Sequence, residues 1–504
     1  MRNNLFDTLF NGQPEHEPCL QLADDSIITY GELLLESARV ANALVALGVQ
    51  PGDRVAAQVD KNVAAVALYL GTIRAGAVFL PLNTAYTASE VEYFVDDARP
   101  ALFIGTTEAK DSLLPMVQHA KSRLETLSPD GTGGSWPERL REAETEFLTI
   151  AREADDLAAI LYTSGTTGRA KGAMITHDNL ASNAKMLARL WGFHENDILL
   201  HALPIYHTHG LFVAINTVMI AGASMRFLPG FDANQVLQML PACTVMMGVP
   251  TYYSRLLALD EFNASLLTKM RLFISGSAPM TLETHKAFSE RTGMTILERY
   301  GMTETNMITS NPCDGERVPG SVGFPLPGVE IRITKSNTGE VCELLPEKIG
   351  MIEVRGPNVF KGYWRMPEKT AEEFRDDGFF ITGDLGMVDD RGYLHIVGRD
   401  KDMIISGGYN VYPKEIEIPI DKLDGVVESA VIGLPHKDFG ETVIAVVARQ
   451  EDSSIDEAEI IAALSIELAK YKIPKRIFFI DELPRNAMGK IQKNILRDNY
   501  GRIY

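Results

Sequence analysis

Leu161-Tyr-Thr-Ser-Gly-Thr-Thr-Gly-Arg-Ala-Lys-Gly172 is the stretch that says most about how this chain folds and what it holds. Residues 163–168 comprise two glycines and four serine or threonine residues, and Lys171 follows them. Glycine lets the backbone approach a ligand closely, and successive backbone amides form an anion site, so we expect this loop to bind a polyphosphate. It is not a Walker A loop, because Ala170 stands where that motif requires its second glycine, five residues after Gly165.

Strand and helix patterns alternate through most of the chain. The apolar spacing predicts a helix over 30–47 and short strands at 53–59, 245–249 and 272–275. Such alternation argues for mostly parallel sheets with helices on their faces. We therefore expect an α/β fold whose large N-terminal domain is built from these sheets.

Two changes of pattern divide the chain further. Alternating strands at 329–334 and 350–356 predict a β-rich subdomain at about 323–400. Beyond it the chain has a strand–helix pattern of its own, in a stretch long enough for a small domain. We expect an N-terminal domain over 1–400 and a small, mobile α+β C-terminal lid domain over 401–504.

Composition and charge exclude several classes of protein. A formal net charge of −19 repels nucleic acid and anionic membranes. The four cysteines form no CxxC pair, which argues against structural zinc or a disulfide framework and fits a reducing compartment. The apolar segment 63–82 is interrupted by polar and helix-breaking residues, and the N-terminus lacks the apolar core of a targeting peptide. We expect a cytoplasmic protein that binds neither nucleic acid nor membrane.

The segment Glu298-Arg-Tyr-Gly-Met-Thr-Glu-Thr305 groups an aromatic ring, a hydroxyl and a carboxylate. Tyr300 can stack on a base and Thr303 can bind a phosphate oxygen. Glu304 can bind Mg²⁺, a hard cation that takes oxygen ligands. Taken alone, the segment also fits a helix start capped by Thr303.

Four further segments fit a nucleotide site but are weak one by one. They are a sharp turn at 275–279, a Gly-Asp turn at 381–385, a charged segment with a glycine pair at 398–417, and a lysine-bearing loop at 483–490. Each has an ordinary structural interpretation: a strand-to-helix crossover, a plain turn, an interdomain linker and a solvated loop lysine.

Taken in chain order, the glycine-rich loop at 161–172 and the five other segments resemble the acyl-adenylate-forming superfamily. This superfamily includes acyl-CoA synthetases, adenylation domains of peptide synthetases and beetle luciferases. The resemblance extends over roughly residues 20–495. It implies a large N-terminal domain and a C-terminal lid that rotates between two half-reactions. It also implies ATP and coenzyme A as substrates and Mg²⁺ as a cofactor.

The resemblance implies a role for each matching residue. The pyrophosphate loop is expected to comprise Thr163, Ser164, Gly165, Thr166, Thr167, Gly168 and Lys171. The adenosine is expected to contact Ser277, Ala278, Pro279, Tyr300, Gly301 and Met302, and its ribose Asp384 and Arg399. The catalytic residues are expected to be Thr303 at the α-phosphate, Glu304 with Thr163 at Mg²⁺, His207 as a gate, and Lys490 between carboxylate and α-phosphate. The lid is expected to turn at Lys401 and to line a pantetheine tunnel with Gly407 and Gly408.

The expected chemistry explains why Lys490 is needed. A carboxylate that attacks the α-phosphate brings two anions together, so cations must neutralise both while pyrophosphate is displaced. Lys490 and Mg²⁺ fit this requirement. Lys490 must then leave the site before the thioester can form, so we expect the lid to rotate. Because related synthetases are switched off by acetylation of this lysine, a lysine acetyltransferase and a deacetylase acting on Lys490 are candidate partners.

The acyl pocket decides which acid is used. The resemblance places it among 206–210, 249–255 and 301–307. The residues expected to contact the acid are His207, Arg255 and Met307. His207 and His209 share a face of an extended segment, but no nearby carboxylate or cysteine completes a zinc site, so we reject a metal there.

A dicarboxylic acid requires a buried cation for its second carboxylate, because an unpaired buried charge costs roughly several kcal/mol. Arg255 is the candidate, although a surface arginine on the following helix fits the sequence equally well. Arg271, just before a strand, and Lys286, on a helix, are weaker candidates.

The segments around the pocket resemble malonyl-CoA synthetases. This implies ligation of malonate to coenzyme A through an acyl-adenylate, with methylmalonate as a further candidate. The alternatives are a synthetase for another short-chain or aromatic acid, a nucleotide-binding protein without catalysis, and an adenylation domain that loads a carrier protein. Intact Lys171, Glu304 and Lys490 argue against the second, and the lack of a carrier domain after residue 504 argues against an obligate carrier protein.

Overall fold

Two large sheets form most of the computed structural model, which describes residues 3–163, 170–335, 340, 348–406, 409–436, 440–486 and 489–501. The first sheet has the strand order β6-β5-β3-β4-β7-β8. Its strands are β3 (Arg54–Gln58), β4 (Val78–Pro81), β5 (Leu102–Thr106), β6 (Arg123–Leu127), β7 (Leu157–Thr163) and β8 (Lys171–Thr176). Its neighbours are parallel except for β7 and β8, the antiparallel strands on either side of the glycine-rich loop.

The second sheet has nine strands in the order β15-β14-β13-β12-β11-β9-β10-β1-β2. They are β1 (Pro18–Gln21), β2 (Ile27–Thr29), β9 (Ile198–His201), β10 (Ser224–Phe227), β11 (Val245–Gly248), β12 (Leu272–Ser275), β13 (Leu297–Met302), β14 (Asn306–Ser310) and β15 (Phe324–Pro325). The six strands from β13 to β1 are parallel, and antiparallel strands complete both edges. The prediction of mostly parallel sheets is confirmed.

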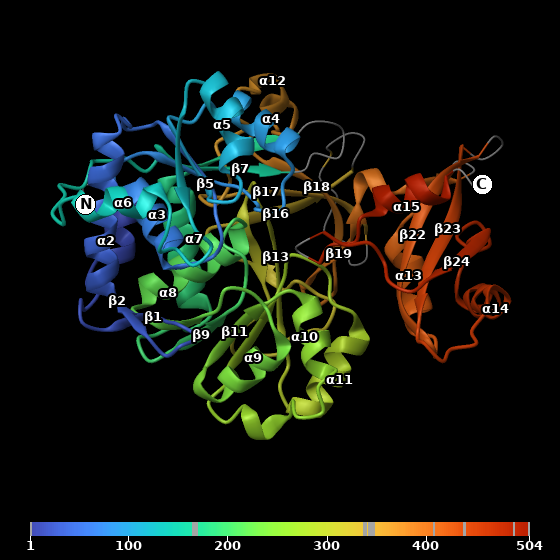
Figure 1. The fold of residues 1–504 in the computed structure, drawn as a ribbon. Coiled ribbons are helices and arrows are strands. Elements are labelled where there is room, and N and C mark those ends of the chain that lie inside the picture. The colour runs from blue at the N-terminus through green and yellow to red at the C-terminus, as the bar shows by residue number, and fades with distance from the viewer. Residues whose placement is uncertain are drawn as a thin grey trace.

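Helices fill the space between the two sheets (Figure 1). They are α1 (Asn4–Phe10), α2 (Tyr30–Ala46), α3 (Val63–Arg74), α7 (His177–Leu190) and α8 (Asn216–Ala221), with α6 (Ser135–Glu142) beside α2 and a π-helix (His209–Ile215) leading into α8. Helix α3 is apolar on nearly every face, which is the pattern of a helix covered on all sides. One continuous core therefore joins the inner faces of both sheets.

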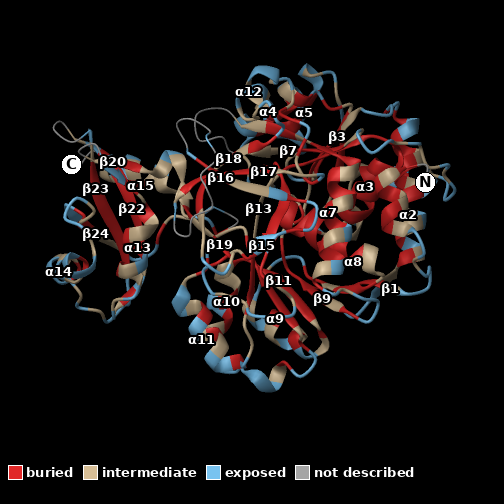
Figure 2. Cartoon of the chain, turned by 180° about the vertical axis from the view of Figure 1, so that it is seen from behind, coloured by how far each residue is buried: buried red, intermediate tan, exposed pale blue. Residues whose placement is uncertain are grey.

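Further helices cover the outer face of each sheet. Helices α4 (Ala88–Ala98) and α5 (Lys110–His119) pack on the first sheet, and α9 (Ala233–Met239), α10 (Pro250–Leu257) and α11 (Leu282–Thr292) pack on the second. Side chains alternate accordingly: Val55 and Ala57 of β3 face the inner core, and Ala56 faces the outer helices. Figure 2 shows the buried strands in red and the exposed outer faces of α9, α10 and α11 in blue.

An antiparallel sheet follows in the region predicted to be β-rich. Its strands are β16 (Glu330–Thr334), β17 (Gly350–Arg355), β18 (Phe380–Val388) and β19 (Leu394–Arg399), in sequence order, with α12 (Pro367–Glu372) between β17 and β18. Short 3₁₀ turns lie at Leu240–Ala242, Ala264–Leu266 and Asp400–Asp402.

The C-terminal part has its own sheet and its own core, and Figure 1 shows it in red beside β18 and β19. Its strands are β20 (Ile404–Ser406), β21 (Tyr409–Val411), β22 (Val426–His436), β23 (Gly440–Arg449) and β24 (Arg476–Ile480). Helices α13 (Pro413–Asp421) and α14 (Glu457–Glu467) cover one face, and α15 (Lys493–Tyr500) covers the other. The predicted fold class is thus confirmed. Nowhere in the described ranges is a helix both long and apolar enough to span a bilayer.

Candidate active site

The residues predicted to bind phosphates meet around Glu304, in the turn between β13 and β14. Glu304 is buried, and its Oε1 lies 3.1 Å from the Tyr363 hydroxyl and 3.5 Å from Thr163 Oγ1. Lys171 has its Nζ 4.1 Å from the centre of the Tyr363 ring and 3.4 Å from Glu373 Oε1. The structure therefore brings Thr163, Lys171 and Glu304 together. The other predicted loop residues lie outside the described residues: Ser164, Gly165, Thr166, Thr167 and Gly168.

Glu304 is suited to a hard cation. Burial raises its pKa, while the Tyr363 hydroxyl and the charges of Lys171 and Arg399 oppose the rise. Its carboxylate and the Thr163 hydroxyl are oxygen donors, which Mg²⁺ prefers. Within the described residues, no group of three or more His, Cys, Asp and Glu could hold a metal. A Mg²⁺ ion at Glu304 would therefore complete its ligand set from phosphates.

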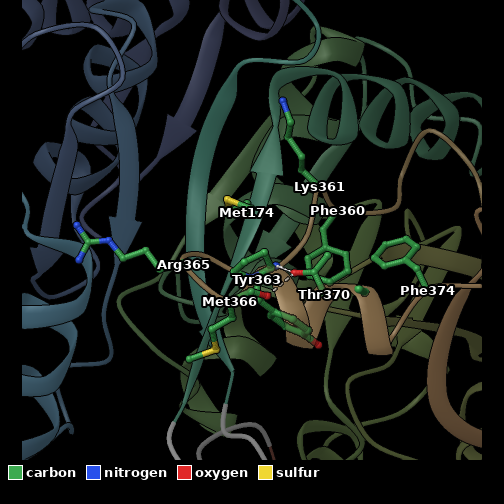
Figure 3. A pocket seen from close by; sticks show the side chains of 10 residues that line it. Met174, Phe360, Lys361, Tyr363, Arg365, Met366, Thr370 and Phe374 are labelled. Atoms are coloured by element: carbon green, nitrogen blue, oxygen red, sulfur yellow. Dashed lines mark hydrogen bonds between the residues drawn. The ribbon is translucent and has the colours of Figure 1, made fainter.

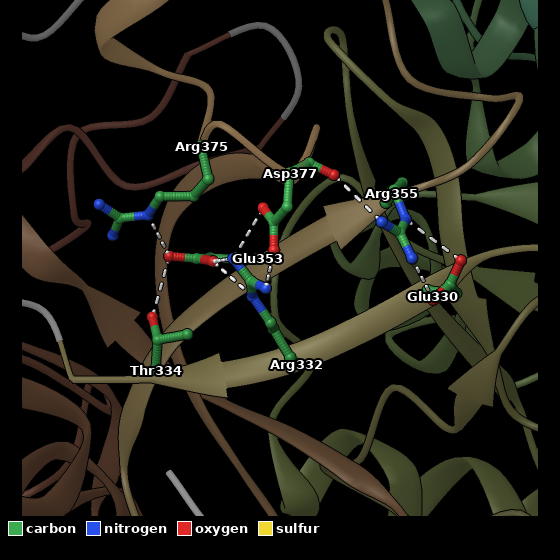
Figure 4. A network of polar contacts seen from close by, with 7 residues as sticks. All are labelled: Glu330, Arg332, Thr334, Glu353, Arg355, Arg375 and Asp377. Atoms are coloured by element: carbon green, nitrogen blue, oxygen red, sulfur yellow. Dashed lines mark hydrogen bonds and ion pairs between the residues drawn. The ribbon is translucent and has the colours of Figure 1, made fainter. Parts of the chain in front are cut away.

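A network of ion pairs around the buried Glu353 supports this side of the site (Figure 4). The Glu353 carboxylate accepts hydrogen bonds at 2.8 Å from Arg332 Nε and from Arg375 Nε, and at 3.0 Å from Thr334 Oγ1. These bonds tie the segment before β18 to β16 and β17. That segment carries Glu373, the partner of Lys171.

A pocket of about 570 Å³ lies on the other side of Tyr363. Its lining is mainly apolar: Met174, Phe360, Tyr363, Met366, Pro367, Ala371 and Phe374 contribute to it. Figure 3 shows the charged ends of Lys361 and Arg365 extending away from it. This pocket therefore does not fit a phosphate or a carboxylate.

Asp384 and Arg399 form the predicted ribose site on the neighbouring strands β18 and β19. Asp384 is buried, and its two oxygens lie 2.7 Å from Arg399 Nε and 2.5 Å from the Tyr300 hydroxyl. The Asp384 carboxylate raises the pKa of Arg399. Tyr300, predicted to lie against the adenine, is thus fixed by the carboxylate predicted to bind the ribose.

A compact turn separates the nucleotide side from the predicted acyl pocket. A Cβ atom on Gly301 would lie 2.0 Å from the Asn306 carbonyl oxygen and 2.6 Å from Met307 Cε, so only glycine fits here. Met307 is buried, and Met302 and Thr303 are half-buried in the same turn. The pocket wall at this point is therefore tight.

The turn after β12 lies next to the segment that carries His207 and His209. Ser277 has a φ of 71°, a left-handed conformation that is strained for a residue other than glycine. Its Oγ lies 3.2 Å from His209 Nδ1, and the buried His209 Nε2 has no hydrogen-bond partner within the described residues. Ala278 is half-buried and Pro279 is exposed. His207 lies next to His209, with its Nδ1 3.3 Å from the His209 backbone N–H.

The buried cation predicted for the acyl pocket is not Arg255. The Arg255 side chain is exposed on α10, so the prediction that it is the buried cation is wrong. Arg299 of β13, by contrast, is a buried cation: among the described residues, its Nε and Nη2 atoms have no hydrogen-bond partner. A Cβ atom on Gly276 would lie 2.4 Å from the Arg299 guanidinium carbon, so this glycine makes room for it.

Arg299 sets the charge of the pocket. Burial lowers the pKa of Arg299 to about 9, which still leaves it charged at neutral pH. Burial and the Arg299 charge lower the pKa of His207 to about 4 and that of His209 well below its ordinary value. In the part of the chain that the structure describes, Arg299 is therefore a cation without an ion-pair partner, and the two imidazoles that its charge affects are neutral.

The weaker candidates are used elsewhere. Arg271 pairs with Asp197 at 2.6 Å, and Lys286 lies on the surface of α11, 4.0 Å from Glu290.

The sequence does contain a signal for Arg299, because Arg299 shares a strand face with the buried Leu297. A charged residue at a core-facing strand position indicates a functional role.

Lys490 reaches the same cleft from the C-terminal part of the chain. Burial in the cleft and the charge of Arg399 lower its pKa, whereas the charges of Asp384, Asp402 and Glu304 act in the opposite direction. The Lys490 ammonium is therefore within range of the charges of Arg399, Asp384 and Glu304. Its surface remains open to solvent, so the cleft is not sealed.

The lid loop also touches the N-terminal part directly. A Cβ atom on Gly489 would lie 3.4 Å from Thr251 Oγ1 at the start of α10. Lys401 lies in the 3₁₀ turn after β19, where burial, followed by the charges of Arg399 and Lys490, lowers its pKa to about 8. Gly407 and Gly408 lie outside the described residues.

Comparisons with known proteins identify the family. Residues 6–364 match the AMP-binding enzyme family, and residues 415–490 match the AMP-binding enzyme C-terminal domain. The chain belongs to the AMP-binding enzyme family. Its site residues therefore lie in a fold that is known to bind an adenine nucleotide.

The names of several relatives state an activity. The mitochondrial malonate–CoA ligase ACSF3 of Mus musculus is 36% identical over 506 residues, covering 93% of this chain and 86% of the relative. A feruloyl-CoA synthase of Amycolatopsis is 36% identical over 479 residues, covering 94% of each chain. The ATP-bound crystal structure of MatB from Rhodopseudomonas palustris is 56% identical, with a TM-score of 0.97 and 100% of both chains covered.

The chain superposes more closely on the ATP-bound structure of this relative than on its apo structure. The apo structure of the same Rhodopseudomonas palustris protein gives a TM-score of 0.87, against 0.97 for the ATP-bound form.

Proposed function

We propose that this AMP-forming acyl-CoA synthetase ligates malonate to coenzyme A, giving malonyl-CoA, AMP and pyrophosphate, with methylmalonate as a second acid. The observation that carries the proposal is Arg299, a buried guanidinium with unpaired N–H groups beside the predicted acyl pocket. A second carboxylate on the acid would pair with it, whereas a neutral acyl tail would leave the buried charge unpaired. The names of the malonate–CoA ligase relatives support the same acid.

In the first half-reaction a malonate carboxylate oxygen attacks the α-phosphorus of ATP, the bond to the β-phosphate breaks, and pyrophosphate leaves. We assign residues 163–168 and Lys171 to the departing phosphates and Thr303 to the α-phosphate. Lys490 lies between the two reacting anions and reduces their repulsion. Mg²⁺ held by Glu304 and Thr163 would add positive charge against the phosphate oxygens.

The remaining assignments orient the nucleotide and the acid. Adenosine is assigned to Ser277, Ala278, Pro279, Tyr300, Gly301 and Met302, with its ribose on Asp384 and Arg399. His207, neutral at pH 7 because of its lowered pKa, is assigned to the gate between phosphate and acid. Met307 limits the length of the acid that the pocket accepts.

In the second half-reaction the coenzyme A thiol attacks the acyl carbonyl and AMP leaves. Lys490 must withdraw before the thiol can enter, so we propose that residues 401–504 rotate as a lid about Lys401. Gly407 and Gly408 are assigned to the tunnel for the pantetheine arm, because glycine allows the closest approach of backbone to ligand.

The test is AMP formation with a panel of acids, comparing two arginine variants. The wild type should prefer malonate over acetate, propionate, butyrate, benzoate and ferulate. Arg299→Met should lose at least about 100-fold in kcat/KM for malonate, the cost of stranding a buried carboxylate. Arg255→Met, which removes an exposed arginine on α10, is the matched control and should keep wild-type preference. Equal loss in both variants, or a wild type without preference for malonate, would contradict the proposal.

A second candidate function is ligation of another short-chain or aromatic acid, favoured by the feruloyl-CoA synthase relative. The same panel separates it from malonate ligation. A nucleotide-binding protein without catalysis would form no AMP with any acid. An enzyme that loads a carrier protein would form the adenylate but release no thioester to free coenzyme A.

Location and regulation are separate proposals. The free cysteines Cys19, Cys243 and Cys313 fit a reducing compartment, and we propose the cytoplasm. Acetylation of Lys490 would remove the charge that adenylation needs. Treatment of cell-purified protein with a lysine deacetylase should then raise its activity, and unchanged activity would count against this regulation.

A further inference from the structure

A second unpaired cation lies behind the acyl pocket. Lys61 is buried between β3 and α3, immediately before the N-cap residue Asn62. In the part of the chain that the structure describes, no carboxylate forms an ion pair with Lys61. The positive end of the α3 dipole makes this an unfavourable place for a cation. Because a buried positive charge at this position costs free energy, we expect Lys61 to have a function that offsets this cost.

The contacts of Lys61 are those of an ammonium group. Its Nζ lies 2.8 Å from His201 Nδ1, 2.8 Å from the His201 carbonyl oxygen and 4.4 Å from the centre of the Phe227 ring. His201 Nε2 lies 2.8 Å from the Gly210 carbonyl oxygen, which can only accept, so Nε2 carries the proton and Nδ1 is an acceptor. Burial lowers the pKa of Lys61. Even so, its three contacts are all acceptors: His201 Nδ1, the His201 carbonyl oxygen and the face of the Phe227 ring. They match the three N–H bonds of an ammonium group, and none of them can donate a hydrogen bond to the lone pair of a neutral amine.

His201 connects Lys61 to the segment that carries the pocket histidines. Gly210 is the second residue of the π-helix, and its neighbour His209 contacts Ser277 at 3.2 Å. A Cβ atom on Gly210 would lie 2.0 Å from the Pro204 carbonyl oxygen, so the segment is packed too tightly to shift freely. Any change in the Lys61–His201 contact is therefore transmitted to His209.

Two unpaired buried cations, Arg299 and Lys61, thus flank one cluster of imidazoles. Burial, followed by the charge of Lys61, lowers the pKa of His201, and burial, followed by the charge of Arg299, lowers those of His207 and His209. All three rings stay neutral between the two charges. The interior of the pocket is consequently more positive than Arg299 alone would make it.

We propose that Lys61 is a positioning and specificity-determining residue, which acts through His201 to favour acids with a second carboxylate over acids with a neutral tail. It does not touch the acid. It adds positive potential behind Arg299 and holds the Gly210 carbonyl, and with it His209, in place. The inference rests on the proposed function, because only a dicarboxylate brings the second negative charge.

The test compares kcat/KM for malonate and propionate, acids with the same number of carbons, in Lys61→Met and Lys61→Gln. Both variants remove the charge, and Lys61→Gln keeps two N–H donors for His201. Both should lower kcat/KM for malonate about tenfold, the effect of one unit charge acting over roughly 10 Å at an effective dielectric constant of about 20. The loss should appear in KM for malonate, with KM for ATP unchanged. Lys110→Met, which removes an exposed lysine on α5, is the control and should change neither acid.

Propionate turnover serves as the internal measure of correct folding. If propionate and malonate fall together, Lys61 is only structural and the inference is overturned. If the wild-type preference for malonate survives in both variants, the inference fails while the proposed function stands. If the wild type itself does not prefer malonate to propionate, the proposed function fails and the inference with it. Should Lys61→Met not fold, Lys61→Gln carries the comparison.

Discussion

Arg299 is charged at neutral pH but loses its proton at lower pH than an ordinary arginine. Its pKa is about 9 because burial disfavours the charged form, so the cation is present below pH 9 and lost above it. We predict that kcat/KM for malonate falls relative to that for propionate above about pH 9, approaching tenfold for each further pH unit. Rates of AMP formation from about pH 7 to about pH 10 measure this ratio.

The matched variant identifies the titrating group. In Arg299→Met the fall of this ratio that begins at about pH 9 should disappear, because the group that titrates there is absent. A wild-type ratio that stays constant to about pH 10 would show that the second carboxylate is not held by Arg299.

Arg255 and Arg299 show what the sequence predicts about single residues and what it does not. A dicarboxylate requires a buried cation, and this requirement follows from charge alone. Which arginine is the buried cation depends on the burial of its side chain. On α10, the position of a residue around the helix axis determines whether its side chain faces the pocket wall or the solvent. Arg255 falls on the solvent side. Asp384, Arg399 and Tyr300 are brought into contact only by the pairing of β18 with β19 and by the approach of β13.

At the scale of elements, the turn between β13 and β14 depends on Gly301. An added methyl group would collide with the Asn306 carbonyl oxygen and with Met307 Cε. We predict that Gly301→Ala lowers the free energy of unfolding by roughly 1–3 kcal/mol, the usual cost of overpacking. Thermal or urea denaturation measures it. Gly230→Ala, at an exposed position with open space around it, is the control, and equal stability of the two variants would refute the steric argument.

Periodicity predicts elements well where packing is simple. The helix expected over 30–47 is α2 (Tyr30–Ala46), and the strand expected at 272–275 is β12 (Leu272–Ser275). The π-helix at His209–Ile215 has no such signal, because its residues are all apolar or small apart from His209 and are buried on every side. Its backbone shape follows from contacts with β9 and α8 rather than from its own sequence.

At the scale of the whole molecule, the site is assembled from parts that are distant in the chain. Glu304 and Asp384 come from the N-terminal part, and Lys490 comes from a part with its own sheet and core. The order of the motifs predicts that these residues share one site. It does not predict how closely Lys490 approaches Glu304 and Asp384, because that depends on how the C-terminal part packs against the rest of the chain.

The lid position yields a prediction that separates the two half-reactions. Lys490→Ala removes the cation that we assign to the reacting carboxylate and α-phosphate, so adenylation should fall about 100- to 1,000-fold, the effect of losing one preorganised charge in a site. Thioester formation from supplied malonyl-adenylate should be nearly unchanged, because the lysine has then left the site. Lys422→Ala, at an exposed lysine at the end of α13, should leave both half-reactions at the wild-type rate. If Lys490→Ala slows both half-reactions equally, the lysine acts through the stability of the lid, and a lid that rotates it out of the site is excluded.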